Sequence, residues 1–335
     1  MADKTHIEWT DATWNVITGC SVISPGCTNC YAMKLAGTRL KNHPTRAGLT
    51  IDSKAGPVWN GEVRFNESML LDPLRWRRPR NIFVCAHGDL FHEAVPDEWI
   101  DRVFTVMALA PQHTFQVLTK RPERMREYIV KNPGFNIRTS MQSIKRQAVI
   151  DMTWPLPNVL LGVSVEDQPR ADERRDHLGT LAWHGWRTFV SYEPALGPVD
   201  WTGWDFLKWM ISGGESQPGA RPSHPDWHRA ARDFCAANSI PYLFKQWGDW
   251  LPFGQSGFYA WDAANRSSQA QAKQWRGFAR LVTKSGSVSV DWKVGPLLTA
   301  ASIGGERRLC VKIGKSRAGR LLDGVEHNGM PEAQP

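Results

Sequence analysis

The chain has 335 residues and carries 41 Lys plus Arg against 33 Asp plus Glu, which gives a formal net charge of +8 and a pI near 9.3. This length allows either one large barrel domain with an appendage or two ordinary domains. The sequence contains no apolar run near about eighteen residues and no charged-then-apolar leader. We therefore expect no membrane span and no secretory signal, and we expect a cytoplasmic protein.

In chain order, short apolar runs alternate with helix-like stretches. The apolar runs are rich in branched and aromatic residues and predict strands over Trp14–Thr18, Asn81–Ala86, Thr114–Thr119, Val159–Val165, Arg187–Tyr192, Lys208–Ser212 and Pro241–Lys245. Helices are predicted between them over Pro96–Ala110, Pro122–Lys131, Arg170–Leu181 and Pro225–Asn238, several with proline at the first turn. Continuous apolar strands separated by helices predict an α/β fold with a parallel sheet.

Two stretches interrupt this alternation. A polar segment at about 37–65 predicts a loop insertion that could act as a lid, and residues 254–335 lack βα periodicity. We therefore predict a barrel-like domain over 1–253 and an appended C-terminal region over 254–335 with a basic tail. Within that region, Ser267–Lys273 predicts a flexible loop.

The chemistry-bearing feature is a cluster of three cysteines, Cys20, Cys27 and Cys30, in the run GCSVISPGCTNCYA. Three thiolates around a cubane iron–sulfur cluster leave the fourth iron open, whereas a structural zinc site normally closes with a fourth ligand. The nearest candidates for a fourth zinc ligand are His6 and His43. The remaining cysteines, Cys85, Cys235 and Cys310, are scattered, which is unlike a disulfide framework.

The cysteine run also carries a family resemblance. It begins upstream with IEWTDATWNVITGC, and further motifs follow in order: FVCAHGDLFHEAVP (Phe83–Pro96), LTKRPERM, SYEPALGPVD, ISGGESQPGARPSHPDW, FKQWGDW and AGRLLDGVEHNGMPE. With these motifs the chain resembles the phage- and mobile-element-associated three-cysteine-motif family, a divergent branch of the radical S-adenosylmethionine (SAM) enzymes. The cysteine gaps of six and two residues differ from the usual three and two, and the aromatic Tyr31 follows the last cysteine.

The resemblance implies a partial (β/α)6-type radical SAM barrel in which Cys20, Cys27 and Cys30 bind a [4Fe-4S] cluster. The open iron would chelate SAM, and reduction would release a 5′-deoxyadenosyl radical. An electron donor such as flavodoxin or ferredoxin is then implied, and a separately encoded partner protein is left open. The basic charge and the phage association suggest modification or repair of a nucleic-acid base or sugar.

Barrel enzymes place their active sites at the carboxyl ends of the strands, so polar residues that follow each predicted strand are candidate site residues. The cofactor candidates are Tyr31, Ser164, Glu166, Ser191, Glu193, Gly213, Gly214 and Glu215. The substrate candidates are His87, Asp89, Lys120, Arg121 and Lys245. The Gly-Gly-Glu segment resembles the superfamily element that receives the SAM amino group, and its alternative interpretation is a tight turn with a capping glutamate.

A competing interpretation is a non-catalytic, zinc-stabilised nucleic-acid-binding protein. Basic residues cluster around Trp76, after Thr119 and in the tail, which suits a phosphate backbone, although a solvated cationic surface has the same composition. Most tryptophans should be core or barrel-wall residues, although stacking faces could come from Trp201, Trp204 and Trp209, or from Trp247 and Trp250. An ordinary SAM-dependent methyltransferase usually has a glycine-rich loop after its first strand, and here that strand leads to cysteines.

Overall fold

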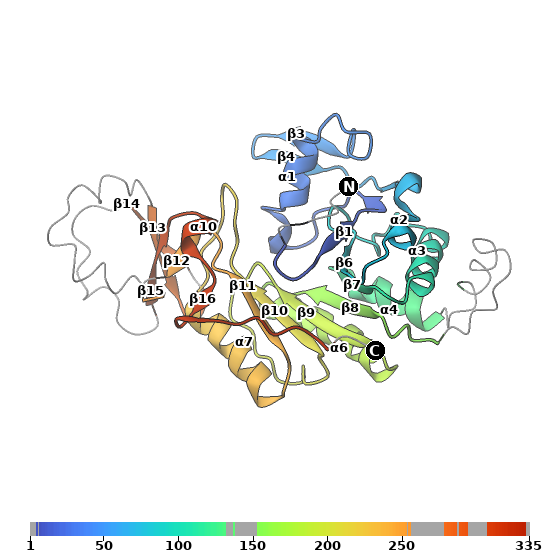
Figure 1. The fold of residues 1–335 in the computed structure, drawn as a ribbon. Helices are drawn as coiled ribbons and strands as arrows, with labels where there is room; N and C mark the ends of the chain where they lie inside the picture. Colours follow the sequence, from blue (N-terminus) through green and yellow to red (C-terminus); the bar gives the residue numbers. More distant parts are fainter. Residues whose placement is uncertain are drawn as a thin grey trace.

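The computed structural model describes residues 5, 7–131, 137, 153–252, 254–255, 278–286, 288–293 and 307–332. Its centre is a seven-stranded parallel sheet that curls into a half-barrel (Figure 1). The strands stand side by side in chain order: β1 (Ala12–Trp14), β6 (Asn81–Val84), β7 (Thr114–Thr119), β8 (Val159–Ser164), β9 (Arg187–Tyr192), β10 (Trp209–Gly213) and β11 (Tyr242–Gln246). The predicted α/β fold with parallel strands is confirmed, and the sheet has seven strands where a (β/α)6-type barrel would have six.

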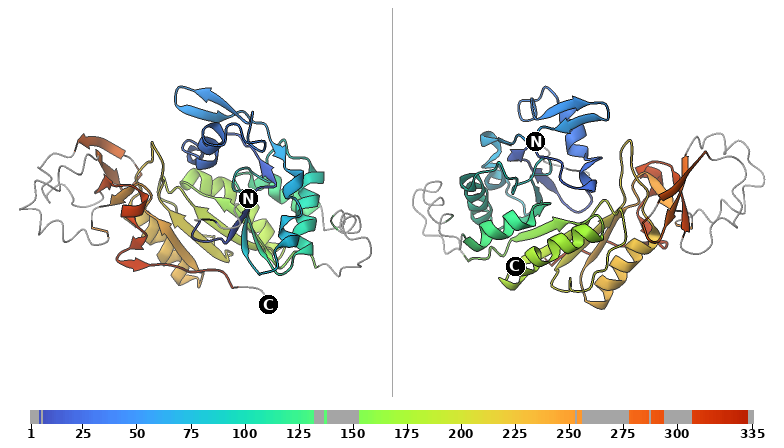
Figure 2. Two further views of the ribbon diagram at one scale, coloured as in Figure 1. Left: turned by 45° about the horizontal axis from the view of Figure 1, so that its top comes forward. Right: turned by 180° about the vertical axis from the view of Figure 1, so that it is seen from behind.

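Four long helices cover the convex face of this sheet (Figures 1 and 2). They are α3 (Asp97–Leu109), α4 (Pro122–Lys131), α6 (Gln168–Trp183) and α7 (Pro225–Ala237), and all four predicted helices are confirmed. Crossovers of one hand between neighbouring parallel strands place these four helices on the same face. Across the part of the chain that the structure describes, no helix is both long and apolar enough to cross a lipid bilayer.

Side chains alternate across the sheet between two apolar cores. Leu160, Phe189, Trp209 and Ile211 pack with Trp9 on the concave face, while their neighbours along each strand pack against the helices. Strands that are buried on both faces are continuous apolar runs in the sequence. This is why the sequence located β7 to β11 within one residue at each end.

The predicted first strand, Trp14–Thr18, is wrong in its position. β1 ends where that prediction begins, and β2 (Ile17–Thr18) pairs instead with β5 (Arg64–Phe65) in an antiparallel ribbon. The backbone N–H of Asn66 donates to the Val16 carbonyl at 2.7 Å, which draws the chain out of the central sheet. The insertion is thereby joined to the segment that leads into the cysteines.

The predicted insertion is a small layer beside the cysteine loop (Figure 1). It follows α1 (Tyr31–Gly37) and contains the antiparallel hairpin of β3 (Thr50–Ser53) and β4 (Gly56–Trp59). Met33 and Trp59 belong to a buried cluster against which Cys20 and Cys30 pack. Three short helices complete this half of the chain: η1 (Pro25–Cys27), η2 (Glu67–Met69) and α2 (Asp72–Arg75).

The C-terminal part contains an antiparallel sheet that the sequence analysis did not predict. Its strand order is β12 (Trp250–Pro252), β15 (Arg307–Lys312), β13 (Phe278–Thr283) and β14 (Val288–Lys293). β12 precedes the predicted boundary at 253 and pairs with a strand that follows it. The predicted flexible loop Ser267–Lys273 lies outside the described residues.

After this sheet the chain returns to the central half-barrel through α10 (Lys315–Ala318), β16 (Leu321–Leu322) and β17 (Val325–Glu326). The backbone N–H of Phe244 donates to the His327 carbonyl at 3.0 Å, and Gly329 N–H donates to the Tyr242 carbonyl at 2.9 Å. The C-terminal segment therefore runs along β11 and protects the last strand of the sheet.

A buried histidine between α7 and the sheet should make stability depend on pH. His228 Nδ1 lies 2.6 Å from Ser212 Oγ and Nε2 lies 2.9 Å from Ser223 Oγ, and burial lowers the pKa of His228 from 6.5 to about 3. The unfolded chain takes up this proton below about pH 6.5 and the folded chain only near about pH 3, so stability falls as the pH drops between these values.

We expect His228→Gln to reduce the stability loss between pH 7 and pH 5 by about 2 kcal/mol relative to the wild type. Urea unfolding at pH 7 and pH 5 measures the free energy of unfolding of each protein. The comparison uses the change in this free energy between the two pH values and not the absolute stability of either protein. Equal pH dependence in the two proteins would contradict the assignment.

Candidate functional site

A cavity of about 670 Å³ lies at the carboxyl ends of the parallel strands. Its wall is formed by the cysteine loop (residues 20–30), by α1, by the carboxyl-terminal residues of β8 and β11, and by residues that follow β6, β7, β9 and β10. This is the end of a βα barrel where active sites occur. Its volume is in the range of about 300–1,000 Å³ that is usual for small-molecule sites.

The structure brings most of the predicted site residues together at this cavity. The cavity is lined by all three cysteines and by eleven of the thirteen other candidates: Tyr31, His87, Asp89, Lys120, Arg121, Ser164, Ser191, Glu193, Gly214, Glu215 and Lys245. Gly213 and Glu166 do not line it. Lining residues outside the predicted set include Trp9 and Asn29, which the motif IEWTDATW and the cysteine run itself could have indicated.

The three cysteines are free thiols that open onto the same cavity. Backbone N–H groups of Cys27 and Cys30 donate to Ser24 and Cys27 carbonyls at 2.9 and 3.2 Å, which folds the loop into a compact turn before α1. Burial raises the pKa of Cys20 to about 12 and also raises that of Cys30. A bound metal would displace such protons, because thiolates are the ligating form.

Three thiols of one loop are soft donors of the kind that bind iron–sulfur clusters or zinc, and of the two candidates for a fourth zinc ligand, His43 does not line the cavity. His43, one candidate for a fourth zinc ligand, is exposed and has its Nδ1 2.8 Å from Thr45 Oγ1. The other candidate, His6, lies outside the described residues. Among the described side chains, no three His, Cys, Asp or Glu groups, the three loop cysteines included, are arranged to hold a single ion.

Arg121 joins the ends of β6 and β7 to the first cysteine. Its Nη1 lies 3.1 Å from Asp89 Oδ2 and 3.6 Å from Cys20 Sγ, and its Nη2 donates to Ser21 Oγ at 2.6 Å. Asp89 also accepts from Thr119 Oγ1 at 2.7 Å. The guanidinium is thus a buried cation beside a cysteine sulfur. It lowers the pKa of Cys20, while burial and the nearby Asp89 carboxylate raise it.

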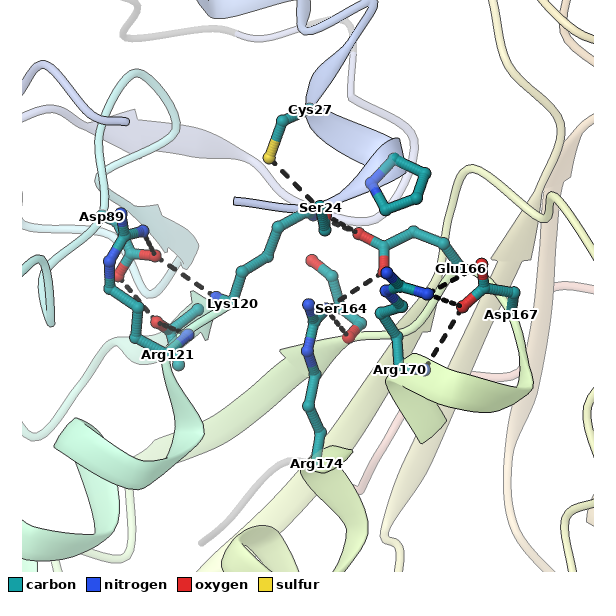
Figure 3. A network of polar contacts seen from close by, with 12 residues as sticks. Ser24, Cys27, Asp89, Lys120, Arg121, Ser164, Glu166, Asp167, Arg170 and Arg174 are labelled. Atoms are coloured by element: carbon teal, nitrogen blue, oxygen red, sulfur yellow. Dashed lines mark hydrogen bonds and ion pairs between the residues drawn. The ribbon is translucent and has the colours of Figure 1, made fainter. Parts of the chain in front are cut away.

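Glu166, which follows β8, lies beneath the cysteine loop (Figure 3). Its Oε1 accepts a hydrogen bond from Ser24 Oγ at 2.7 Å and lies 3.3 Å from Lys120 Nζ, while Oε2 lies 3.1 Å from Arg174 Nη1. Burial of Glu166 opposes ionisation, but Lys120 and Arg174 hold the pKa of its carboxyl below the usual value. Since Glu166 is fully buried and does not line the cavity, its described contacts are with the protein.

Glu215, which follows β10, is also bound to the cysteine loop. Its Oε2 accepts from Asn29 Nδ2 at 3.0 Å and from Arg221 Nε at 2.8 Å. Arg221 Nη2 in turn donates to the Pro25 carbonyl at 3.0 Å. Of the two glycines before this glutamate, Gly214 is sterically required, because a Cβ on it would lie 2.1 Å from the Trp247 carbonyl oxygen.

Glu193 and Lys245 form an ion pair on the cavity wall. Lys245 Nζ lies 2.9 Å from both carboxylate oxygens of Glu193, and Gln246 Nε2 donates to Oε1 at 3.3 Å. Gln246 and Trp9 also line the cavity. Each has a buried polar atom, Oε1 of Gln246 and Nε1 of Trp9, that has no hydrogen-bond partner among the described residues. Unpaired buried polar atoms are costly, so a ligand or water in the cavity would satisfy them.

Neither the basic cluster around Trp76 nor the five tryptophans predicted as stacking faces line the cavity. The basic residues around Trp76 precede β6, at the opposite end of the sheet from the cavity, and the Arg80 guanidinium lies over the Trp76 ring at 4.9 Å. The predicted stacking faces are wrong, because all of these tryptophans are buried: Trp201, Trp204, Trp209, Trp247 and Trp250.

Comparisons with known proteins place the whole chain in one family. No curated protein and no solved structure gave a significant match. A family model described as "Protein of unknown function (DUF5131)" matches residues 4–331, which is nearly the full length of the chain. The chain therefore belongs to the DUF5131 family.

Proposed function

We propose that this protein is an enzyme of the radical SAM type, with Cys20, Cys27 and Cys30 as the protein ligands of a [4Fe-4S] cluster. The observation that carries the proposal is the opening of three free thiols from one loop onto a cavity at the carboxyl ends of a curled parallel sheet. Bound there, a cluster with one open iron would supply reductive cleavage of SAM to a 5′-deoxyadenosyl radical.

The residues of the chain would bind and orient the small molecule. Glu193 offers a carboxylate to an amino group or a ribose diol, and Ser164 and Ser191 contribute polar surface on the same wall. Trp9 and Tyr31 add aromatic surface, which reduces the water that can surround a reactive species. The insertion beside the cysteines shields the loop from another side.

The substrate class within this proposal is a nucleic-acid base or sugar. The excess of positive charge on the chain favours a phosphate-bearing substrate. Four lysines line the cavity, of which Lys120 and Lys245 also pair with Glu166 and Glu193: Lys34, Lys120, Lys245 and Lys315. A one-electron donor of the flavodoxin or ferredoxin type is part of the same proposal.

The test is oxygen-free purification, reconstitution with iron and sulfide, and absorption and electron paramagnetic resonance spectra with and without SAM. We expect broad absorption near about 400 nm and a reduced-cluster signal that changes when SAM is added. Cys27→Ala should lose both features. Cys235→Ala is the matched control, because this buried cysteine packs against Met210 Sδ at 3.5 Å and does not line the cavity.

One result would overturn the proposal. A colourless protein that carries one stoichiometric zinc and does not respond to SAM would instead favour the zinc-stabilised nucleic-acid-binding protein. That alternative predicts binding to DNA or RNA that weakens steeply with salt.

A further inference from the structure

The cysteine loop is held by side chains from several strand ends, through contacts that involve no metal. We infer that this loop is already formed in the metal-free chain, and that Glu166 is the positioning residue that fixes it. The inference goes beyond the proposed function, because it concerns the protein scaffold and holds for any metal that the thiols bind.

Glu166 contacts the middle of the cysteine loop. Ser24 Oγ donates to Glu166 Oε1 at 2.7 Å. A Cβ built on Gly26 would lie 2.5 Å from the same oxygen and 2.6 Å from Glu166 Cγ, so the loop backbone rests directly on this side chain. Only glycine permits this approach without displacement of one of the two.

Glu166 is itself held in place by neighbouring residues. Arg174 and Lys120 hold its carboxylate, and the backbone N–H of Leu196 donates to the Glu166 carbonyl at 2.8 Å. Buried side chains in such ion pairs and hydrogen bonds have few alternative conformations. Arg174 meets this condition because it is 1% exposed. The loop therefore contacts a rigid support.

Side chains other than Glu166 hold the two ends of the cysteine loop. Arg121 binds Ser21 beside the first cysteine, and Arg221 with Glu215 binds Pro25 and Asn29 before the last one. Three points of attachment distributed along residues 20–30 leave the loop few alternative conformations. The conformational entropy of ordering the thiols is then lost during folding rather than during metal binding.

The test uses the full-length, metal-free chain. Iodoacetamide labelling followed by mass spectrometry gives a separate reaction rate for each cysteine, and hydrogen exchange gives the protection of residues 20–30. We expect Ser24→Ala to label Cys27 and Cys30 on the order of 10-fold faster than the wild type, because the charge-assisted hydrogen bond to Glu166 is lost. Ser24 Oγ also lies 3.6 Å from Cys27 Sγ, so Cys30 gives the readout of loop positioning. Gly26→Ala should act in the same direction, and Ser24→Thr should restore slow labelling.

Two controls separate positioning from general destabilisation. Val22→Ala changes a side chain that is 45% exposed in the same loop, and we expect wild-type labelling rates. Cys235 is buried in α7, so its labelling within each variant reports global unfolding and should not accelerate.

The inference is overturned if the loop cysteines of the metal-free wild type react as fast as in the urea-unfolded chain. It is also overturned if Ser24→Ala and Gly26→Ala label like the wild type. Slow labelling together with an absence of any cluster signal would leave this inference standing and remove the proposed function, so the two failures are distinguishable.

Discussion

Glu166→Ala should lower the free energy of unfolding by about 3–5 kcal/mol, the usual cost of removing one partner from a buried ion pair. Glu166 and Arg174 have side chains 0% and 1% exposed, so the substitution leaves a buried guanidinium without its counter-charge. It also removes the hydrogen bond acceptor of Ser24. Denaturant unfolding of the metal-free chain measures the loss.

Glu173→Ala is the matched control for this prediction. Glu173 lies 4.0 Å from Nε of the same arginine, but its side chain is 59% exposed, so we expect a change within about 0.5 kcal/mol. The double variant Glu166→Ala, Arg174→Ala should lose less than the sum of the single losses, because the two side chains interact directly. Additive losses would show that the pair does not stabilise the fold as described.

Arg121→Met should raise the rate at which a reconstituted protein loses iron to a chelator by about 10–100-fold, the typical effect of losing a group that supports a metal ligand. The substitution retains most of the aliphatic stem but removes the cation 3.6 Å from Cys20 Sγ and the hydrogen bond to Ser21 Oγ. Iron and sulfide per chain, followed over time, give the rate.

Arg124→Met is the control for this second prediction. Arg124 lies on α4, which begins one residue after Arg121, and pairs with Asp97; neither residue lines the cavity. We expect iron retention equal to the wild type. Wild-type retention in Arg121→Met itself would mean that this guanidinium has no influence on the proposed cluster.

These residues show how one set of strand-end positions serves two purposes. Glu193 and Lys245 form an ion pair on the cavity wall, where a ligand can reach them. Glu166 and Glu215, each two residues after the end of its strand (β8 and β10), hold the loop that carries the thiols. The sequence pattern is the same in both cases, namely a polar residue after a buried strand, and it does not distinguish a binding residue from a positioning residue.

The sequence pattern also does not show whether a basic residue binds a substrate or pairs with an acid of the protein. Arg121 and Lys120 were predicted as substrate contacts, and both line the cavity, but their partners are Asp89 and Glu166. Charges that are close in the fold can be distant in the sequence, and a run of basic residues contains no information about the acids that neutralise it. The substrate contacts of these two residues remain predictions.

The sequence by itself determined the parallel α/β fold, the positions of most strands and helices, and the loop that carries the three thiols. It could do so because buried strands, amphipathic helices and clustered cysteines are local patterns. The tertiary structure alone decided how the loop is held: Ser24 and Glu166 are 142 residues apart, and Asn29 and Glu215 are 186 residues apart. It also decided the departure of β2 from the sheet and the antiparallel C-terminal sheet, because pairings between distant segments depend on which surfaces the folded core brings within hydrogen-bonding distance.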